Sequence, residues 1–222
     1  MKRAQALSSG PMRPVAFFLA LVASLGVAAA DLVLPPGAPL GSRSPEQLSA
    51  QWWQWAMSVP GEASPVRDPT GANCGAGQDG DVWFLAGGFG MPKIRRVCEV
   101  PAGKFLFFPL VQKGDRSRTC EQARSGAALR NVEALEVFAE IDGVAVPNPK
   151  RYRVATQGCF DVYAKVSPML GKAEPHPSAS DGYWLLVKPP SKGRHVIKFS
   201  ARYDSLVGGG LEQDVEYELR VQ

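Results

Sequence analysis

Apolar and polar positions along this chain form three successive patterns, and each pattern predicts a different kind of structure. The first is an uninterrupted apolar run over residues 15–27. The second is an apolar repeat of three and four residues over 44–58, which is the period of one helix face. From residue 82 onward, short runs alternate between apolar and polar side chains, as in half-solvated strands. These patterns predict one N-terminal amphipathic helix followed by a mainly β fold.

The helix expected over 44–58 has sequence signals at both ends. Ser44 is a good N-cap, Pro45 suits the first helical position, and Gln47 completes a capping-box pattern. Pro60 ends the run, because proline cannot continue a helix. Residues 31–43 before this helix are rich in proline and glycine, which favours an irregular arm.

Three tryptophans lie within four positions of this helix, in the stretch QWWQWAMSVP. Trp52 and Trp55 share a face with Leu48, so packing against a sheet explains them. Trp53 lies about 100° further round the helix. Trp53 is therefore either at the flank of the buried face or partly exposed. A helix anchored across a sheet by aromatic residues is the more common explanation of such a cluster, and a platform for a carbohydrate or an aromatic ligand built on Trp53 is the alternative.

The rest of the chain predicts a series of short strands bounded by glycine and proline. They cover residues 82–86, 94–100, 105–111, the two arms of 135–146, 152–155, 160–166, 183–188, 195–203 and 215–221. Asp142-Gly143 is typical of a type I′ hairpin turn. Frequent turns with few helices between strands favour a single-domain antiparallel β-sandwich, jelly-roll-like, over residues 44–222.

The N-terminal segment resembles a secretory signal peptide over residues 1–30. Lys2, Arg3 and Arg13 precede or open the apolar run, and Ala28-Ala29-Ala30 offers small residues for cleavage near Ala30. Cleavage there removes three of the 25 basic residues and none of the 21 acidic ones, which leaves a net charge of +1. Without a basic stripe, nucleic-acid binding is not expected. We expect a periplasmic or extracellular protein that has no membrane span after cleavage.

Four cysteines remain in the exported chain: Cys74, Cys98, Cys120 and Cys159. An even number of cysteines in an oxidising compartment predicts two disulfides. Three pairings satisfy that count. We favour Cys74 with Cys98 and Cys120 with Cys159, since each pair closes a loop of moderate length.

Cofactor and metal motifs are weak in this sequence. Residues 75–80 spell G-x-G-x-x-G, but a strand candidate follows where a dinucleotide fold needs a helix, so no cofactor is expected. Asp68, Asp79 and Asp81 offer oxygen ligands for Ca²⁺, although their spacing lacks the EF-hand pattern. Aspartates beside glycines are more often turn residues, and we predict no metal site.

Candidate catalytic groups also have structural explanations. His195 shares a strand face with Ile197 and Phe199, so we expect a partly buried histidine bonded to backbone rather than a general base. No serine lies in a G-x-S-x-G elbow. Arginine and tyrosine side chains suited to a polysaccharide lyase are present without diagnostic spacing: Arg95, Arg96, Tyr152, Arg153 and Tyr163.

One set of aromatic and cationic residues suggests ligand recognition. Its members, which could stack on sugar rings or hold acidic sugars, are Trp53, Trp83, Arg95, Arg96, Tyr183 and Trp184. We therefore expect a non-catalytic binding module whose partner is a glycan or another cell-envelope component. Two alternatives stay open: an extracytoplasmic polysaccharide lyase or hydrolase, and a structural envelope protein. The sequence does not indicate the oligomeric state.

Four blocks of the chain carry a resemblance to other proteins: WWQWAMSVP, CGAGQDGDVWFLAGG, CEVPAGKFLFFPL and DGYWLLVKPPSKGRHVIKF. With these blocks in this order, the chain is similar to exported bacterial proteins of unassigned function. The resemblance spans nearly the whole exported chain and implies export and a β-rich fold. It implies no activity and no catalytic residues.

Overall fold

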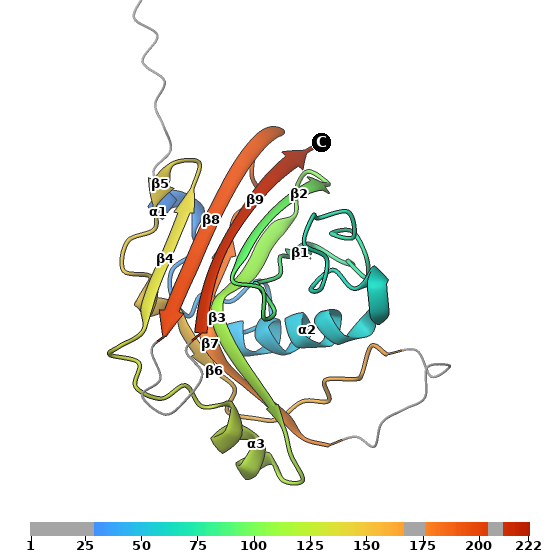
Figure 1. The fold of residues 1–222 in the computed structure, drawn as a ribbon, viewed down its shortest axis with the longest axis vertical. Coiled ribbons are helices and arrows are strands. Elements are labelled where there is room, and N and C mark those ends of the chain that lie inside the picture. The colour runs from blue at the N-terminus through green and yellow to red at the C-terminus, as the bar shows by residue number, and fades with distance from the viewer. Residues whose placement is uncertain (1–28, 167–175, 204–210) are drawn as a thin grey trace, which may run out of the picture.

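The computed structural model describes residues 29–166, 176–203 and 211–222, and it shows two mixed β-sheets packed together (Figure 1). Residues 1–28 of the predicted signal peptide lie outside the described residues. The four-stranded sheet has the order β1 (Val82–Phe84), β3 (Phe105–Arg116), β7 (Ser178–Val187), β6 (Arg153–Ala155). The five-stranded sheet has the order β2 (Lys93–Val100), β9 (Leu211–Val221), β8 (Gly193–Tyr203), β4 (Glu136–Ile141), β5 (Val144–Ala145).

The described part of the chain also contains three α-helices. They are α1 (Ala29–Leu32), α2 (Pro45–Ser58) and α3 (Cys120–Ala127), with 3₁₀ turns η1 (Gly61–Ala63) and η2 (Pro149–Tyr152). The predicted N-terminal helix is confirmed as α2: the Ser44 hydroxyl accepts from the Gln47 N–H, and the Gln47 side chain accepts from the Ser44 N–H. Among these described helices, none has the length and apolar content that crossing a membrane requires.

The main core lies between the two sheets, where alternating strand residues meet. In β2 every second residue is buried, and in β9 Val215, Tyr217 and Leu219 point inward as their alternation predicts. They pack with side chains of the opposite sheet, among them Phe108 and Leu185. Burial of this apolar face is what holds the two layers together.

Helix α2 crosses the outer face of the four-stranded sheet (Figure 1). Trp52 and Trp55 are each 1% exposed and pack against Phe84 of β1 and Trp184 of β7. Trp53 is only partly buried, at the edge of this helix-side core. The predicted division of the three indoles is therefore confirmed.

The sheets are mixed, so the prediction of a purely antiparallel sandwich was wrong. β1 pairs parallel to β3, and β2 pairs parallel to β9. The chain leaves β1 for the other sheet, forms β2 there, and returns as β3 beside β1, which orients β1 and β3 alike. Alternation of side chains marks a strand as half-buried and carries no information about its partner's direction.

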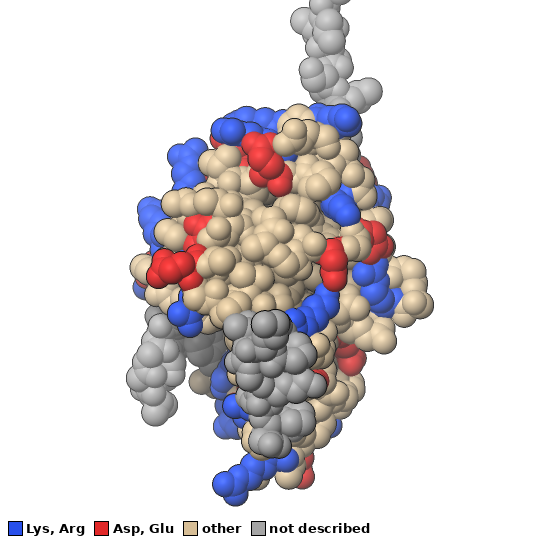
Figure 2. Space-filling model, turned by 90° about the vertical axis from the view of Figure 1, so that its right-hand side faces the viewer, with Lys and Arg blue, Asp and Glu red and all other residues tan. Residues whose placement is uncertain are grey.

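The glycine-rich segment 61–80 covers the outer edge of β2. The Val97 N–H donates to the Thr70 carbonyl at 2.9 Å, and a disulfide joins Cys74 to Cys98 on the same strand. This cover satisfies an edge strand that would otherwise present unpaired backbone groups. Figure 2 views the side of the molecule on which this segment lies, and the middle of that face is uncharged.

The second disulfide joins Cys120 at the start of α3 to Cys159, so both predicted pairs are confirmed. The two bridges indicate an oxidising, extracytoplasmic environment. The predicted turn at Asp142-Gly143 is confirmed as well, since both residues have positive φ (50° and 81°), as a type I′ turn requires.

Residues 160–166 form turns, and the strand predicted there was wrong. The Asp161 carboxylate accepts from the Tyr163 N–H at 2.9 Å, and the Val166 N–H donates to the Tyr163 carbonyl at 2.9 Å. These local bonds offer the backbone an alternative to a sheet ladder. Within residues 160–166, Phe160 alone makes a β-bridge, which joins it to Ser178.

Candidate functional site

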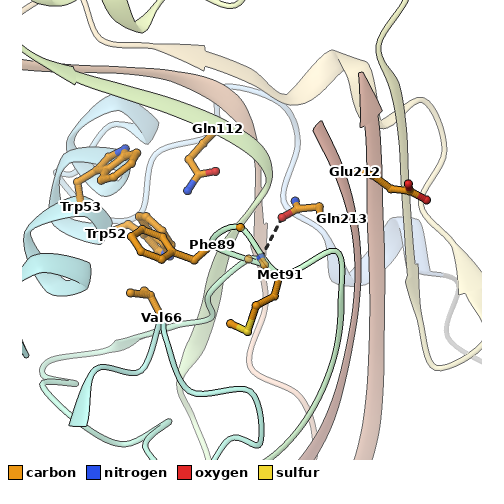
Figure 3. Close-up of a pocket in the computed structure, with 11 residues that line it drawn as sticks. Trp52, Trp53, Val66, Phe89, Met91, Gln112, Glu212 and Gln213 are labelled. Atoms are coloured by element: carbon orange, nitrogen blue, oxygen red, sulfur yellow. Dashed lines mark hydrogen bonds between the residues drawn. The ribbon is translucent and has the colours of Figure 1, made fainter. Parts of the chain in front are cut away.

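A cavity of about 530 Å³ lies where α2, β3, the 87–91 loop and the start of β9 meet (Figure 3). Its volume falls within the usual range for small-molecule sites. It is lined by Trp52, Trp53, Val66, Gly87, Gly88, Phe89, Gly90, Met91, Gln112, Glu212 and Gln213. Four separate stretches of chain, together with Val66, form one hollow.

Two indoles from α2 make the helix wall of this cavity, and each is fixed by its N–H. Trp52 Nε1 donates to the Leu85 carbonyl at 2.9 Å, and Trp53 Nε1 donates to the Ser180 hydroxyl on β7 at 2.9 Å. The rings meet edge to face, with centroids 5.3 Å apart. This wall is held in place by hydrogen bonds as well as by packing.

The 87–91 loop also lines the cavity, and it carries an exposed phenylalanine. Phe89 is 48% exposed and has a φ of 44°, and the Arg67 guanidinium carbon lies 5.9 Å from its ring centroid. The base of the loop is anchored: the Gly88 N–H donates to Gln213 Oε1 at 3.0 Å (Figure 3), and Gln213 Nε2 donates to the Leu110 carbonyl. An apolar ring therefore stands at the mouth of the cavity on a fixed base.

Polar groups inside the cavity are few. Gln112 of β3 directs its side-chain amide into the hollow (Figure 3), and this amide has no hydrogen-bond partner among the described residues. Glu212 is the one charged residue among those that line the cavity, and Figure 3 shows its carboxylate pointing away. Gln112 can donate two hydrogen bonds and accept others, so it suits an uncharged ligand with hydroxyl or amide groups.

The structure brings only one of the six residues predicted to bind ligand to this cavity, which is Trp53. Trp83 and Trp184 are 7% and 2% exposed, and neither indole Nε1 has a hydrogen-bond partner among the described residues. Trp184 stacks on Phe107 in the helix-side core. Tyr183 packs in the main core, where burial raises the pKa of its hydroxyl.

The two predicted arginines lie on opposite faces of β2. Arg95 is exposed and forms an ion pair with Glu216 at 3.0 Å. Arg96 is wholly buried and donates to the carbonyls of Val66, Asp68, Ala86 and Gly87. Arg96 thereby joins the 61–80 segment to the base of the 87–91 loop.

The three aspartates considered for Ca²⁺ have protein partners. Asp79 pairs with Lys165 at 3.0 Å, and Asp81 pairs with Arg43 at 2.6 Å. That hydrogen bond from Arg43 lowers the pKa of Asp81. Asp68 accepts from backbone and hydroxyl donors of its own turn. Among the described residues, no cluster of three acidic, histidine or cysteine side chains is placed to hold a metal ion.

His195 is partly buried and bonded to backbone, as predicted. Its Nδ1 lies 2.7 Å from Asp142 Oδ2, and its Nε2 lies 2.9 Å from the Ser191 carbonyl oxygen and 3.3 Å from the Ser191 hydroxyl. This order of groups is similar to a hydrolase triad. A triad needs Nε2 to accept from the serine, whereas here Nε2 faces a carbonyl to which it can only donate. The geometry is that of a structural link.

The residues considered for a lyase are dispersed over the described structure. Arg153 forms a bidentate pair with Asp181, at 3.1 and 2.7 Å, and this hydrogen bonding raises the pKa of Arg153. Tyr152 packs against the main core, and burial raises the pKa of its hydroxyl. Tyr163 lies on the 160–166 turns, on the α2 side of the four-stranded sheet.

Of the cavity residues, sequence reasoning identified only Trp53 as a ligand contact, and those it missed include Phe89, Met91, Gln112 and Gln213. A signal for Phe89 is present, since GGFG places a large apolar ring between glycines, outside any strand pattern. For Gln112 and Gln213 the sequence offers no such signal, because each is a single glutamine in a strand whose exposure depends on the tertiary packing.

Comparisons with known proteins add no assignment: no family model, no curated protein and no solved structure matches this chain. The resemblance of its sequence blocks to exported bacterial proteins stays a prediction.

Proposed function

We propose that this protein is an exported, non-catalytic binding module, and that the cavity between α2, β3 and the 87–91 loop binds a neutral sugar unit of an envelope glycan. The unpartnered amide of Gln112 is the observation that carries this proposal. It stands in a hollow whose other side chains are largely aromatic or apolar. Apolar walls with one or two directed polar groups are typical of small-molecule sites.

The chemistry of the cavity suits a sugar better than a charged ligand. A sugar ring presents C–H faces to the rings of Trp53 and Phe89, and its hydroxyls both donate to and accept from the Gln112 amide. A cationic group would find no carboxylate inside the hollow, because that of Glu212 points away (Figure 3). An anionic group would find no Lys or Arg among the described residues that line the hollow, and the nearby Arg67 guanidinium lies over the Phe89 ring. Burying an unpaired charge there would be unfavourable.

Location in the periplasm or outside the cell supports the same ligand class. The two disulfides are typical of proteins in an oxidising compartment, and the predicted signal peptide over residues 1–30 would direct the chain there. Envelope and extracellular polysaccharides are available there.

Calorimetry with the secreted protein tests the proposal. The probes are linear neutral oligomers of glucose and of N-acetylglucosamine, from one to six units. Replacing Gln112→Ala is expected to lower affinity about tenfold, because one hydrogen bond in a desolvated site contributes about 1–1.5 kcal/mol. Gln122→Ala on the exposed face of α3 is the matched control and leaves affinity unchanged. Absence of binding by every oligomer rejects the proposal.

The non-catalytic part of the proposal has its own measurement. Bound oligomers are expected to be recovered intact after long incubation. New reducing ends would favour the hydrolase alternative, and unsaturated products from uronate polymers would favour the lyase alternative.

A further inference from the structure

A second cavity adjoins the first along β3. It measures about 120 Å³ and is lined by Trp53, Met57, Gly114, Asp115, Arg116, Phe160, Val162, Tyr163, Ser178 and Ala179. Trp53 lines both cavities. Gln112 belongs to the first and Gly114 to the second, and these residues share a face of β3 because side chains alternate along a strand. The two hollows therefore follow one another beside α2.

The indole of Trp53 stands between them in a fixed position. Its Nε1 is tied to Ser180 on β7. Gly114 allows the ring to approach β3 closely, since a Cβ built there would lie 2.7 Å from Trp53 Cζ2. A ligand that leaves the first cavity along β3 must pass this ring edge before it meets the second.

The second cavity offers a further aromatic contact. Tyr163 is partly exposed, and the Arg116 guanidinium carbon lies 5.2 Å from its ring centroid. Its turn is positioned by α2, because Gln54 Nε2 donates to the Asp161 carbonyl at 3.0 Å. The Asp115 carboxylate accepts a hydrogen bond from the Ser117 hydroxyl, with 2.5 Å between Ser117 Oγ and Asp115 Oδ2. Aromatic side chains therefore line both cavities, one on each side of Trp53.

We propose that the two cavities are consecutive subsites of one track, and that its occupant is a linear oligosaccharide crossing the edge of Trp53. This inference rests on the proposed function and extends it from one sugar unit to a chain. Gln112 to Arg116 spans roughly 13 Å of extended strand, which is longer than one sugar ring. Rings spaced along a groove with a neutral amide suit a repeating uncharged polymer, whose C–H faces recur along its length.

Measuring the affinity for sugar oligomers of increasing length tests the inference. The wild type is expected to bind longer oligomers of the recognised sugar about tenfold more tightly than its monomer. Tyr163→Ala removes that gain and leaves monomer affinity within about twofold. Phe89→Ala weakens the binding of oligomers of every length, because Phe89 lines the first cavity and not the second. Phe138→Ala, an exposed aromatic change on β4, is the control and alters neither.

Three results would contradict the proposal of consecutive subsites. The first is that the wild type binds oligomers of all lengths with equal affinity, and the second is that Tyr163→Ala lowers the affinity for the monomer as much as that for longer chains. The third is that an unrelated extended peptide displaces the sugar. In the first two cases a Gln112-dependent monomer site leaves the proposed function standing. Melting temperatures of each variant separate loss of binding from loss of folding.

Discussion

The Arg96 guanidinium donates to the Tyr217 hydroxyl at 2.8 Å, and both side chains are fully inside the protein. The hydroxyl in turn donates to the Ala86 carbonyl and accepts from the Ala86 N–H, each at 2.9 Å. Tyr217→Phe leaves the buried Ala86 N–H without its acceptor, while the Ala86 carbonyl and the Arg96 guanidinium remain bonded to each other. We expect the free energy of unfolding to fall by about 1–3 kcal/mol, as measured by urea titration.

Arg96→Met is expected to cost more than Tyr217→Phe, since it leaves several buried carbonyls without a donor. Arg95→Met on the exposed face of the same strand is the control, and its change should stay near 0.5 kcal/mol. Equal unfolding free energies for the Arg96 and Arg95 variants would contradict the structural role that we assign to Arg96.

Gly114→Ala tests how Trp53 is positioned. The added Cβ would lie 2.7–3.0 Å from three atoms of the indole, so the ring has to move. We expect a loss of about 1–3 kcal/mol in unfolding free energy and a shifted indole N–H signal for Trp53 in NMR spectra. Gly158→Ala is the control, because nothing lies within 4 Å of a Cβ there. An unshifted Trp53 signal would contradict the close approach.

The elements that the sequence predicted are those determined locally. Ser44, Gln47 and Pro60 define α2 by hydrogen bonding and proline sterics alone, and Asp142-Gly143 defines its turn by backbone conformation. The alternation of side chains along β2 places residues 94, 96, 98 and 100 on one face, which is apolar apart from Arg96. The sequence therefore contained the information that Arg96 is buried. Reading that face as buried would have removed Arg96 from the ligand residues.

What the sequence did not predict depends on tertiary partners or on competing local bonds. Helix α3 had a cap signal in Thr119, whose hydroxyl accepts from the Gln122 N–H, but its eight residues carry only a narrow apolar face. The 160–166 segment alternates like a strand, yet Asp161 bonds its own turn. The cavity joins distant stretches of chain, and no local pattern encodes that meeting.

Asp68 is expected to make stability depend on pH in the acid range. Burial alone would raise its pKa, but donors from Asn73 and Thr70 outweigh that effect and hold the pKa below its ordinary value. Its contribution is therefore fully present above the ordinary pKa of an aspartate and is lost as pH falls through the lowered one. Asp68→Asn should cost about 1–3 kcal/mol near pH 7, and that difference should shrink below pH 4.

Asp79→Asn is the comparison for Asp68, because the Asp79 pair with Lys165 lies near the surface and should contribute under 1 kcal/mol. A difference between wild type and Asp68→Asn that is the same at pH 7 and pH 3 would contradict the charge-dependent role of Asp68.

The two disulfides close loops with sequence separations of 24 and 39 residues. In the chain-entropy relation, removing either is expected to lower the unfolding free energy by about 3–4 kcal/mol. The paired changes are Cys74→Ser with Cys98→Ser, and Cys120→Ser with Cys159→Ser, measured by thermal unfolding. Losing the first pair should also speed proteolysis within 61–80. Four free thiols in the secreted protein would refute both bridges.

Asp142 links the β4–β5 turn to β8, and two variants separate its charge from its backbone role. Its Oδ1 accepts from the Val196 N–H at 2.8 Å while its Oδ2 meets His195. Asp142→Asn keeps the positive φ and one acceptor, so we expect a loss of about 1 kcal/mol. Asp142→Ala loses both acceptors and strains the turn, and should cost about 2–4 kcal/mol. Equal unfolding midpoints for the two variants would contradict this role.

The contact of His195 with a backbone carbonyl also predicts that Ser191 is not a nucleophile. Because Nε2 of His195 faces this carbonyl, Ser191 should stay unlabelled by a fluorophosphonate. Labelling of Ser191 that requires His195 would restore the hydrolase interpretation.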